Sequence, residues 1–84
     1  MNNILEKLNL IINEILGEEI ALRPETLLRE AAGEEEGESL GLSSIDMVDL
    51  ISQAEIEFDV GIEERELVNF KSAGDLAKFI EENI

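Results

Sequence analysis

Apolar residues recur every three or four positions along residues 3–16, and this spacing most constrains how the chain can fold. Residues spaced in this way share one face of an α-helix. Here they are Ile4, Leu5, Leu8, Ile11, Ile12, Ile15 and Leu16. Asn3 can cap the start of this helix, and Gly17 follows the last apolar residue as a stop signal. We therefore expect a helix over residues 3–16 with its apolar face in the core.

Residues 44–58 carry a second strong helical signal. Ser43 can cap this helix, and Asp46 three residues later gives a pattern similar to a capping box. The positions that we expect to face the core are Val48, Leu50, Ile51, Ala54 and Phe58. The apolar residues left over, which we expect to remain partly outside the core, are Ile45, Met47 and Ile56.

The segment between these helices, residues 17–43, is a long connection. Leu27 and Leu28 are expected to hold it against the core. Its acidic, glycine-flanked stretch over residues 31–39 is expected to be mobile, because it has almost no apolar residue to anchor it.

The C-terminal part predicts a short helical turn over residues 63–67 and a last helix over about 72–82, with Ser72 as its cap. No strand pattern occurs in the sequence. The fold expected is therefore a small all-α bundle of three main helices plus one short helix, with a long first loop. The length fits a single domain over residues 1–84.

The charge of the chain limits its partners. There are 21 acidic and 6 basic residues, which give a net charge of −15. Such a surface repels nucleic acid and anionic membranes and attracts proteins with basic patches. No secretory signal and no apolar run of transmembrane length is visible. We expect a monomer in the cytoplasm or an organelle matrix, without bound nucleic acid or membrane insertion.

The composition also disfavours metal sites. The chain has no cysteine, which excludes disulfides, thiolate catalysis and cysteine–zinc sites. The acidic stretch that begins at Asp59 fails as a calcium-binding loop, because positions six and twelve hold Glu64 and Phe70 instead of glycine and glutamate. We expect no specific metal site.

Ser44 stands at the start of an acidic helix, after a glycine turn, without a partner that could activate it. A serine nucleophile needs a base within hydrogen-bond reach, and the chain has no histidine. Lys7, Lys71 and Lys78 lie far from it in sequence and show no Ser-x-x-Lys spacing. We expect that the protein is not an enzyme and that Ser44 is a residue to which another enzyme attaches a group.

Residues 40–50, with the sequence LGLSSIDMVDL, resemble the acyl carrier protein family. The usual family motif is Asp-Ser-Leu followed by an acidic amphipathic helix, and the matching residues here are Ser43, Ser44 and Ile45. The resemblance continues to the last helix and covers nearly the whole chain. It implies that Ser44 carries a 4′-phosphopantetheine arm from coenzyme A, attached by a phosphopantetheinyl transferase (holo-acyl-carrier-protein synthase). The arm's thiol would hold acyl intermediates of lipid, fatty acid or polyketide-type biosynthesis as thioesters.

The resemblance also implies that the helix after Ser44 is recognised by acyl-processing enzymes with basic patches. The partner-binding residues it suggests are Ile45, Asp46, Met47, Val48, Asp49, Glu55 and Glu57. It also suggests four residues that could line a pocket for the acyl chain: Ala54, Ile62, Leu67 and Phe70. The alternative for each of them is that it is an ordinary core residue.

Two departures from the family pattern indicate a specialised carrier with its own enzymes. Ser43 replaces the usual acid before the modified serine, and the glutamate-rich stretch 33–38 lengthens the first loop. Ser43 is also the rival attachment site, although its alignment with the motif's Asp favours a capping role. The alternative functions are an unmodified acidic helical module that binds a basic partner, and a peptidyl or aminoacyl carrier.

Overall fold

The computed structural model describes residues 2–29 and 39–84. The elements are the α-helices α1 (Asn2–Leu16) and α2 (Ser44–Phe58), the short 3-10 helix η1 (Glu64–Asn69) and the α-helix α3 (Ala73–Asn83). The described ranges contain no strand. The predicted all-α bundle of three main helices and one short helix is therefore confirmed. Residues 31–39 were expected to be mobile, and residues 31–38 of this stretch lie outside the described residues.

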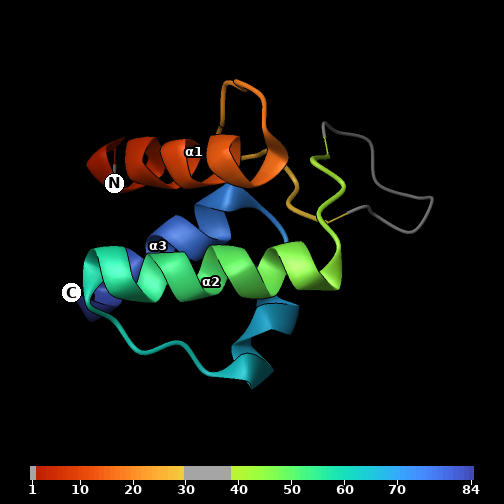
Figure 1. The fold of residues 1–84 in the computed structure, drawn as a ribbon. Helices are drawn as coiled ribbons and strands as arrows, with labels where there is room; N and C mark the ends of the chain where they lie inside the picture. Colours follow the sequence, from red (N-terminus) through yellow and green to blue (C-terminus); the bar gives the residue numbers. More distant parts are fainter. Residues whose placement is uncertain (1, 30–38) are drawn as a thin grey trace.

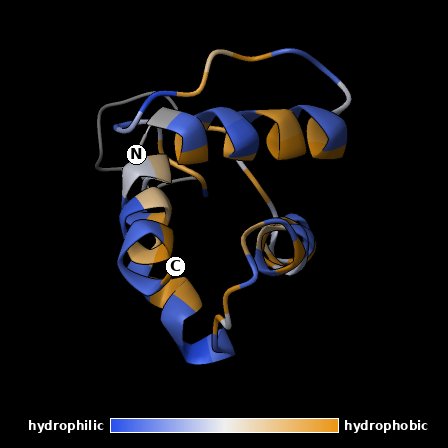
Figure 2. Cartoon of the chain, turned by 90° about the vertical axis from the view of Figure 1, so that its left-hand side faces the viewer, coloured by the Kyte–Doolittle hydropathy of each residue, from blue (hydrophilic) through white to orange (hydrophobic). Residues whose placement is uncertain are grey.

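The three α-helices surround a common apolar core. Figure 1 shows α1 and α2 side by side and running in opposite directions, with α3 behind them and η1 on the side of α2 away from α1. α1 contacts both α2 and α3. The hydrophobic residues of α1 gather on the side that faces the other helices, as Figure 2 shows. The largest fully buried side chains are Leu8, Ile12, Leu28, Met47, Leu50, Leu76 and Ile80.

The ends of α1 confirm one predicted signal and correct another. Gly17 has a positive φ of 72°, and its N–H donates to the carbonyl oxygen of Asn13 at 2.9 Å, as a helix stop requires. The predicted cap at Asn3 is wrong, because the helix already includes Asn2. Asn3 therefore lies inside the helix, whereas a capping residue stands before it.

The inward face of α2 differs from the prediction at two neighbouring residues. Met47 is only 2% exposed, although it was expected at the surface, and Val48 is 54% exposed, although it was expected in the core. Leu50, Ile51 and Ala54 form the centre of the inward face, and Met47 lies one turn before them on the same face. One step along the helix turns the next side chain by about 100°, which carries Val48 outward.

The first connection packs against the start of α3. The carbonyl oxygen of Pro24 accepts the N–H of Gly74 at 2.8 Å, and that of Thr26 accepts the N–H of Ala73 at 2.8 Å. Thr26 is buried, and its hydroxyl oxygen accepts the N–H of Arg23 at 3.0 Å. These bonds hold residues 23–28 in place, and Leu28 anchors them in the core as predicted.

Candidate functional site

The two adjacent serines at the start of α2 have different surroundings. The hydroxyl oxygen of Ser43 accepts the N–H of Asp46 at 3.1 Å, and the Asp46 carboxylate accepts the N–H of Ser43 at 3.2 Å. This reciprocal pair is the predicted capping box, with Asp in place of the more usual Glu. Ser44 is the first residue of the helix, and its side chain is exposed. The cap therefore occupies one hydroxyl and leaves the next one at the surface.

The strand-like pairing of two distant segments fixes the approach to Ser44. The N–H groups of Leu40 and Leu42 donate to the carbonyl oxygens of Leu27 and Leu28, each at 2.9 Å. Leu42 is buried, so it anchors the chain directly before the capping serine. Gly41 between them has a φ of 64°, a left-handed conformation that glycine adopts without steric cost. Glycine at this position makes the turn into α2.

Arg29 is a residue of the site that the sequence did not reveal. Its Nη2 atom lies 3.3 Å from the hydroxyl oxygen of Ser44 and donates to it, across a separation of 15 residues. The hydroxyl of Ser39 donates to the Arg29 carbonyl oxygen at 2.9 Å, which holds the Arg29 backbone beside the turn. No spacing rule links residues so far apart, and the contact follows only from the pairing of the two segments. A guanidinium stays protonated, so Arg29 does not supply a base for Ser44.

The outward face of α2 next to Ser44 is apolar at its centre. Ile45 is 81% exposed and Val48 is 54% exposed, and together with Ser44, Asp49 and Ser52 they line a shallow depression. The Asp49 carboxylate, which is exposed, accepts a hydrogen bond from the side-chain amide of Gln53 at 3.1 Å. An exposed apolar pair with an acid beside it is suited to contact with another protein.

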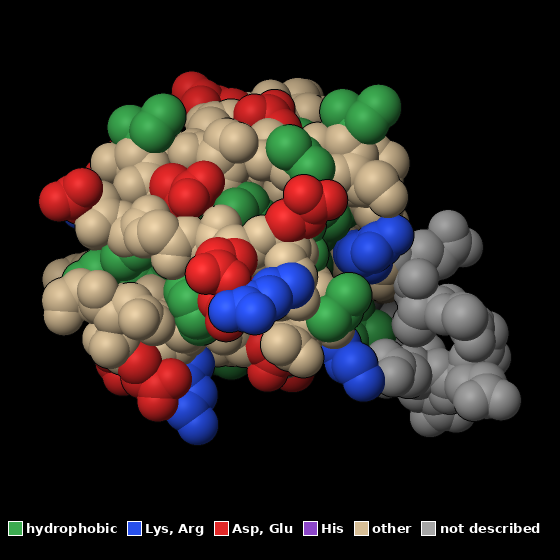
Figure 3. Space-filling view, turned by 90° about the horizontal axis from the view of Figure 1, so that it is seen from below, with side chains coloured by type: hydrophobic (Ala, Val, Ile, Leu, Met, Phe, Trp, Pro, Cys, Tyr) green, Lys and Arg blue, Asp and Glu red, His purple; other side chains and the backbone are tan. Residues whose placement is uncertain are grey.

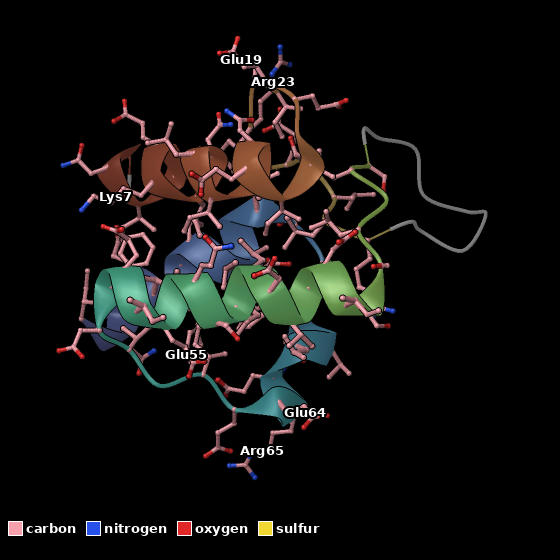
Figure 4. All side chains as sticks on the ribbon, viewed as in Figure 1. Lys7, Glu19, Arg23, Glu55, Glu64 and Arg65 are labelled. Carbon is pink, nitrogen blue, oxygen red and sulfur yellow. The ribbon has the colours of Figure 1, made fainter. Side chains whose placement is uncertain are left out.

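The other predicted partner-binding residues do not share this face. Met47 is buried, which corrects its assignment to the surface, because its side chain fills the core. The Asp46 carboxylate is engaged in the capping box. Glu55 points toward the connection before η1 (Figure 4), where its carboxylate accepts the N–H of Ile62 at 3.0 Å. Glu57 lies toward α1, 3.4 Å from the ammonium nitrogen of Lys7.

The acids visible on one face of the described molecule are spread over that face. Figure 3 shows acidic side chains separated from one another across one face, with hydrophobic and basic side chains between them. Within residues 2–29 and 39–84, no group of three or more potential metal ligands is close enough to hold an ion. No helix in the described part of the chain is long and apolar enough to cross a membrane.

Comparisons with known proteins match the sequence of this chain to a family. Residues 11–80 match the family described as "Phosphopantetheine attachment site". The chain is 32% identical over 82 residues to the acyl carrier protein of Phytoplasma australiense, which covers 96% of this chain and 97% of that protein. It belongs to the acyl carrier protein family. It is also 31% identical over 72 residues to the acyl carrier protein of Wolinella succinogenes, covering 86% of this chain and 91% of that protein.

Membership of this family establishes the cofactor and the class of function. Acyl carrier proteins are carriers and not enzymes, and their cofactor is covalently attached 4′-phosphopantetheine. They are modified by phosphopantetheinyl transferases and interact with acyl-processing enzymes. The site fits such a group, because an exposed hydroxyl stands beside a guanidinium that can bind a phosphate. This carrier has no cysteine, so the thiol for a thioester comes from the cofactor.

The four candidates for an acyl pocket lie in or against the core of the carrier. Ala54, Ile62 and Phe70 are buried in the main core cluster, and the partly buried Leu67 packs against it. The Phe70 ring meets the Phe79 ring edge to face, with centroids 5.4 Å apart. Their burial in or against the core agrees with the core alternative, and their contact with an acyl chain stays a prediction.

Proposed function

We propose that this acyl carrier protein holds its 4′-phosphopantetheine arm on Ser44, with residues 1–84 acting as one carrier domain. The observation that supports this choice is the unequal use of the two serines. The Ser43 hydroxyl closes the capping box, whereas the Ser44 hydroxyl is exposed at the first residue of α2. A transferase can reach the Ser44 hydroxyl without opening the helix start.

In the attachment step, the Ser44 oxygen would attack the phosphorus of coenzyme A that bears the pantetheine. The new phosphodiester bond forms as the pyrophosphate P–O bond of coenzyme A breaks and adenosine 3′,5′-bisphosphate leaves. The hydroxyl proton would pass to a base supplied by the transferase, since the chain has no histidine and Arg29 is a permanent cation. Ser43 and Asp46 hold the first turn of α2 through the capping box, so the backbone of Ser44 keeps one position relative to the outward face. The chain's own contribution is therefore to present one hydroxyl and the surface beside it.

The recognition surface that we propose is smaller than the sequence suggested. It consists of Ile45, Val48 and Asp49, which lie with Ser44 around the shallow depression on α2. The net charge of −15 attracts basic patches on transferases and acyl-processing enzymes from a distance, and the apolar pair then makes the close contact. Glu55 and Glu57 contribute through the overall field, because their carboxylates serve other contacts.

We also propose that the carrier serves a dedicated pathway of lipid, fatty acid or polyketide-type synthesis. Two features of the sequence support this, the serine at position 43 where the family usually has an acid and the glutamate-rich stretch 33–38. Loss of that acid changes the charge next to the attachment residue, and a cognate transferase or acyl-processing enzyme would have to match it. A peptidyl or aminoacyl carrier is the alternative for the cargo.

The attachment is tested by intact-mass spectrometry after incubation with coenzyme A and a broad-specificity phosphopantetheinyl transferase. The wild type should gain the mass of the arm, and Ser44→Ala should gain none while keeping its helical circular dichroism. Ser43→Ala is the matched control. It should lose about 1 kcal/mol of stability with the cap, yet still accept the arm.

Two results would contradict the proposal in different ways. An arm on Ser44→Ala would show that the attachment residue is misassigned. A wild-type chain that resists several transferases, under conditions that modify another carrier, would favour the unmodified acidic interaction module. If the wild type does accept the arm, identification of the group that the arm carries after expression with the neighbouring genes would separate acyl from aminoacyl cargo.

A further inference from the structure

A positively charged side chain lies at the proposed attachment oxygen. Nη2 of Arg29 is 3.3 Å from the hydroxyl oxygen of Ser44, and both side chains are exposed. In the modified protein, phosphorus is bonded directly to that oxygen, so the guanidinium stands beside the atoms that carry the phosphate's charge. We infer that Arg29 binds the phosphodiester of the attached arm, an inference that rests on the proposed attachment at Ser44.

The backbone around Arg29 is held from several directions. The Arg29 carbonyl oxygen accepts the Ser39 hydroxyl at 2.9 Å. The preceding residue, Leu28, is fully buried, donates its N–H to the Lys71 carbonyl oxygen at 2.9 Å and accepts the N–H of Leu42 at 2.9 Å. The side chain of Arg29 therefore starts from a fixed point next to α2. Less conformational entropy is lost when such a side chain binds a ligand than when its backbone is free.

The chemistry of the contact suits a phosphodiester. A guanidinium donates through a planar fork that matches two phosphate oxygens, whereas an ammonium group acts as a point charge. The arm adds a negative charge to a chain whose net charge is already −15, at a helix whose first turn carries Asp46 and whose second turn carries Asp49. Arg29 offsets the repulsion at the place where the new charge appears.

The test compares the modified and unmodified forms of four proteins, the wild type, Arg29→Gln, Arg29→Lys and Arg23→Gln. Arg23 is a matched control, because it lies in the same connection but on the side of α1 away from α2 (Figure 4). Neither position 29 variant removes a core contact, since the Arg29 side chain is exposed and Ser39 binds its backbone. For each protein, intact mass confirms the arm, phosphorus NMR gives the chemical shift of the phosphodiester, and calorimetry gives both melting temperatures.

We expect the phosphorus resonance to move in Arg29→Gln, to move less in Arg29→Lys and to stay in place in Arg23→Gln. The melting temperature of the modified form minus that of the unmodified form should be roughly 2–4 °C lower in Arg29→Gln than in the wild type. The inference would be overturned if the wild type and Arg29→Gln showed the same phosphorus resonance and the same difference in melting temperature between modified and unmodified forms. If Arg29→Gln were only modified more slowly, with no change in the resonance or in the melting-temperature difference, the inference would also be overturned. Arg29 would then contact the transferase and not the phosphodiester. A wild type without an arm on Ser44 would instead refute the proposed function, and the role of Arg29 with it.

Discussion

At the scale of single residues, neighbours in this chain have opposite roles. Ser43 has extended backbone angles and caps α2, whereas Ser44 is already helical and exposed. Met47 is buried and Val48, the next residue, is exposed. The cause is the same in both pairs, because one step into or along a helix changes the direction of the side chain by more than a quarter turn. The site therefore depends on the register of α2 to within one residue.

Gly74 gives a test of packing at this scale. A Cβ atom at position 74 would lie 2.8 Å from the carbonyl oxygen of Pro24, which accepts the Gly74 N–H. Overpacking of this kind costs about 1–3 kcal/mol, so Gly74→Ala should lower the free energy of unfolding in urea by that amount. Gly61→Ala is the matched control, because a Cβ atom there meets nothing within 4 Å. It should be neutral or slightly stabilising. Equal stability of the two variants would show that the backbone at Pro24 can move away from α3 without loss of stability.

At the scale of elements, α2 has three sides with different tasks. Its inward side fills the core, with Met47 and Leu50 among its buried residues. A second side faces α1, where Glu57 pairs with Lys7. The third side, with Ile45 and Val48, is exposed and begins at the proposed attachment residue. One helix therefore stabilises the bundle and presents the recognition surface at the same time.

The register of α2 is tested by alanine at two adjacent positions. Met47→Ala should lower the free energy of unfolding by about 2–5 kcal/mol, because it leaves a cavity in the core. Val48→Ala should cost less than about 1 kcal/mol, since its side chain is more than half exposed. Urea unfolding followed by circular dichroism measures both values. A larger loss for Val48→Ala would mean that the helix is rotated from the position described.

At the scale of the whole molecule, the net charge of −15 is contained in a small volume. The radius of gyration is 11.7 Å. Charges on opposite sides of the molecule interact at low salt, where the screening length is about 30 Å at 0.01 M, and they are largely screened at 0.1 M, where it is about 10 Å. An exposed ion pair such as Lys7–Glu57, at 3.4 Å, offsets little of this repulsion. The repulsion favours the expanded unfolded chain, so it lowers the stability of the fold.

Added salt should therefore stabilise the protein. We expect the melting temperature at neutral pH to rise with sodium chloride and with magnesium in the millimolar range, as the carboxylates are screened. For a chain of this size, each 1 kcal/mol regained raises the melting temperature by roughly 4–8 °C. Calorimetry over a series of salt concentrations measures the trend. A constant or falling melting temperature would show that the acids are too far apart to repel one another appreciably.

The sequence by itself determined the features that depend on local chemistry. The helical segments follow from apolar spacing, and the caps at Ser43 and Ser72 follow from a serine with an acid three residues later. The proposal that Ser44 is the attachment residue also came from the sequence, through its position after the cap and through the family motif. Each of these needs information from only a few neighbouring residues.

The tertiary structure alone decided the features that depend on residues far apart in the chain. Apolar spacing could not distinguish Met47 from Val48, because both lie within a turn of other apolar residues. Only the packing of α2 against α1 and the common core selects the inward face. The role of Glu55, which binds the backbone of Ile62, needs the fold of the chain after α2. The contact of Arg29 with Ser44 exists because Leu27 and Leu28 pair with the residues before α2. Backbone hydrogen bonds between distant segments leave no periodic pattern in the sequence, so this cation beside Ser44 became visible only in the folded molecule.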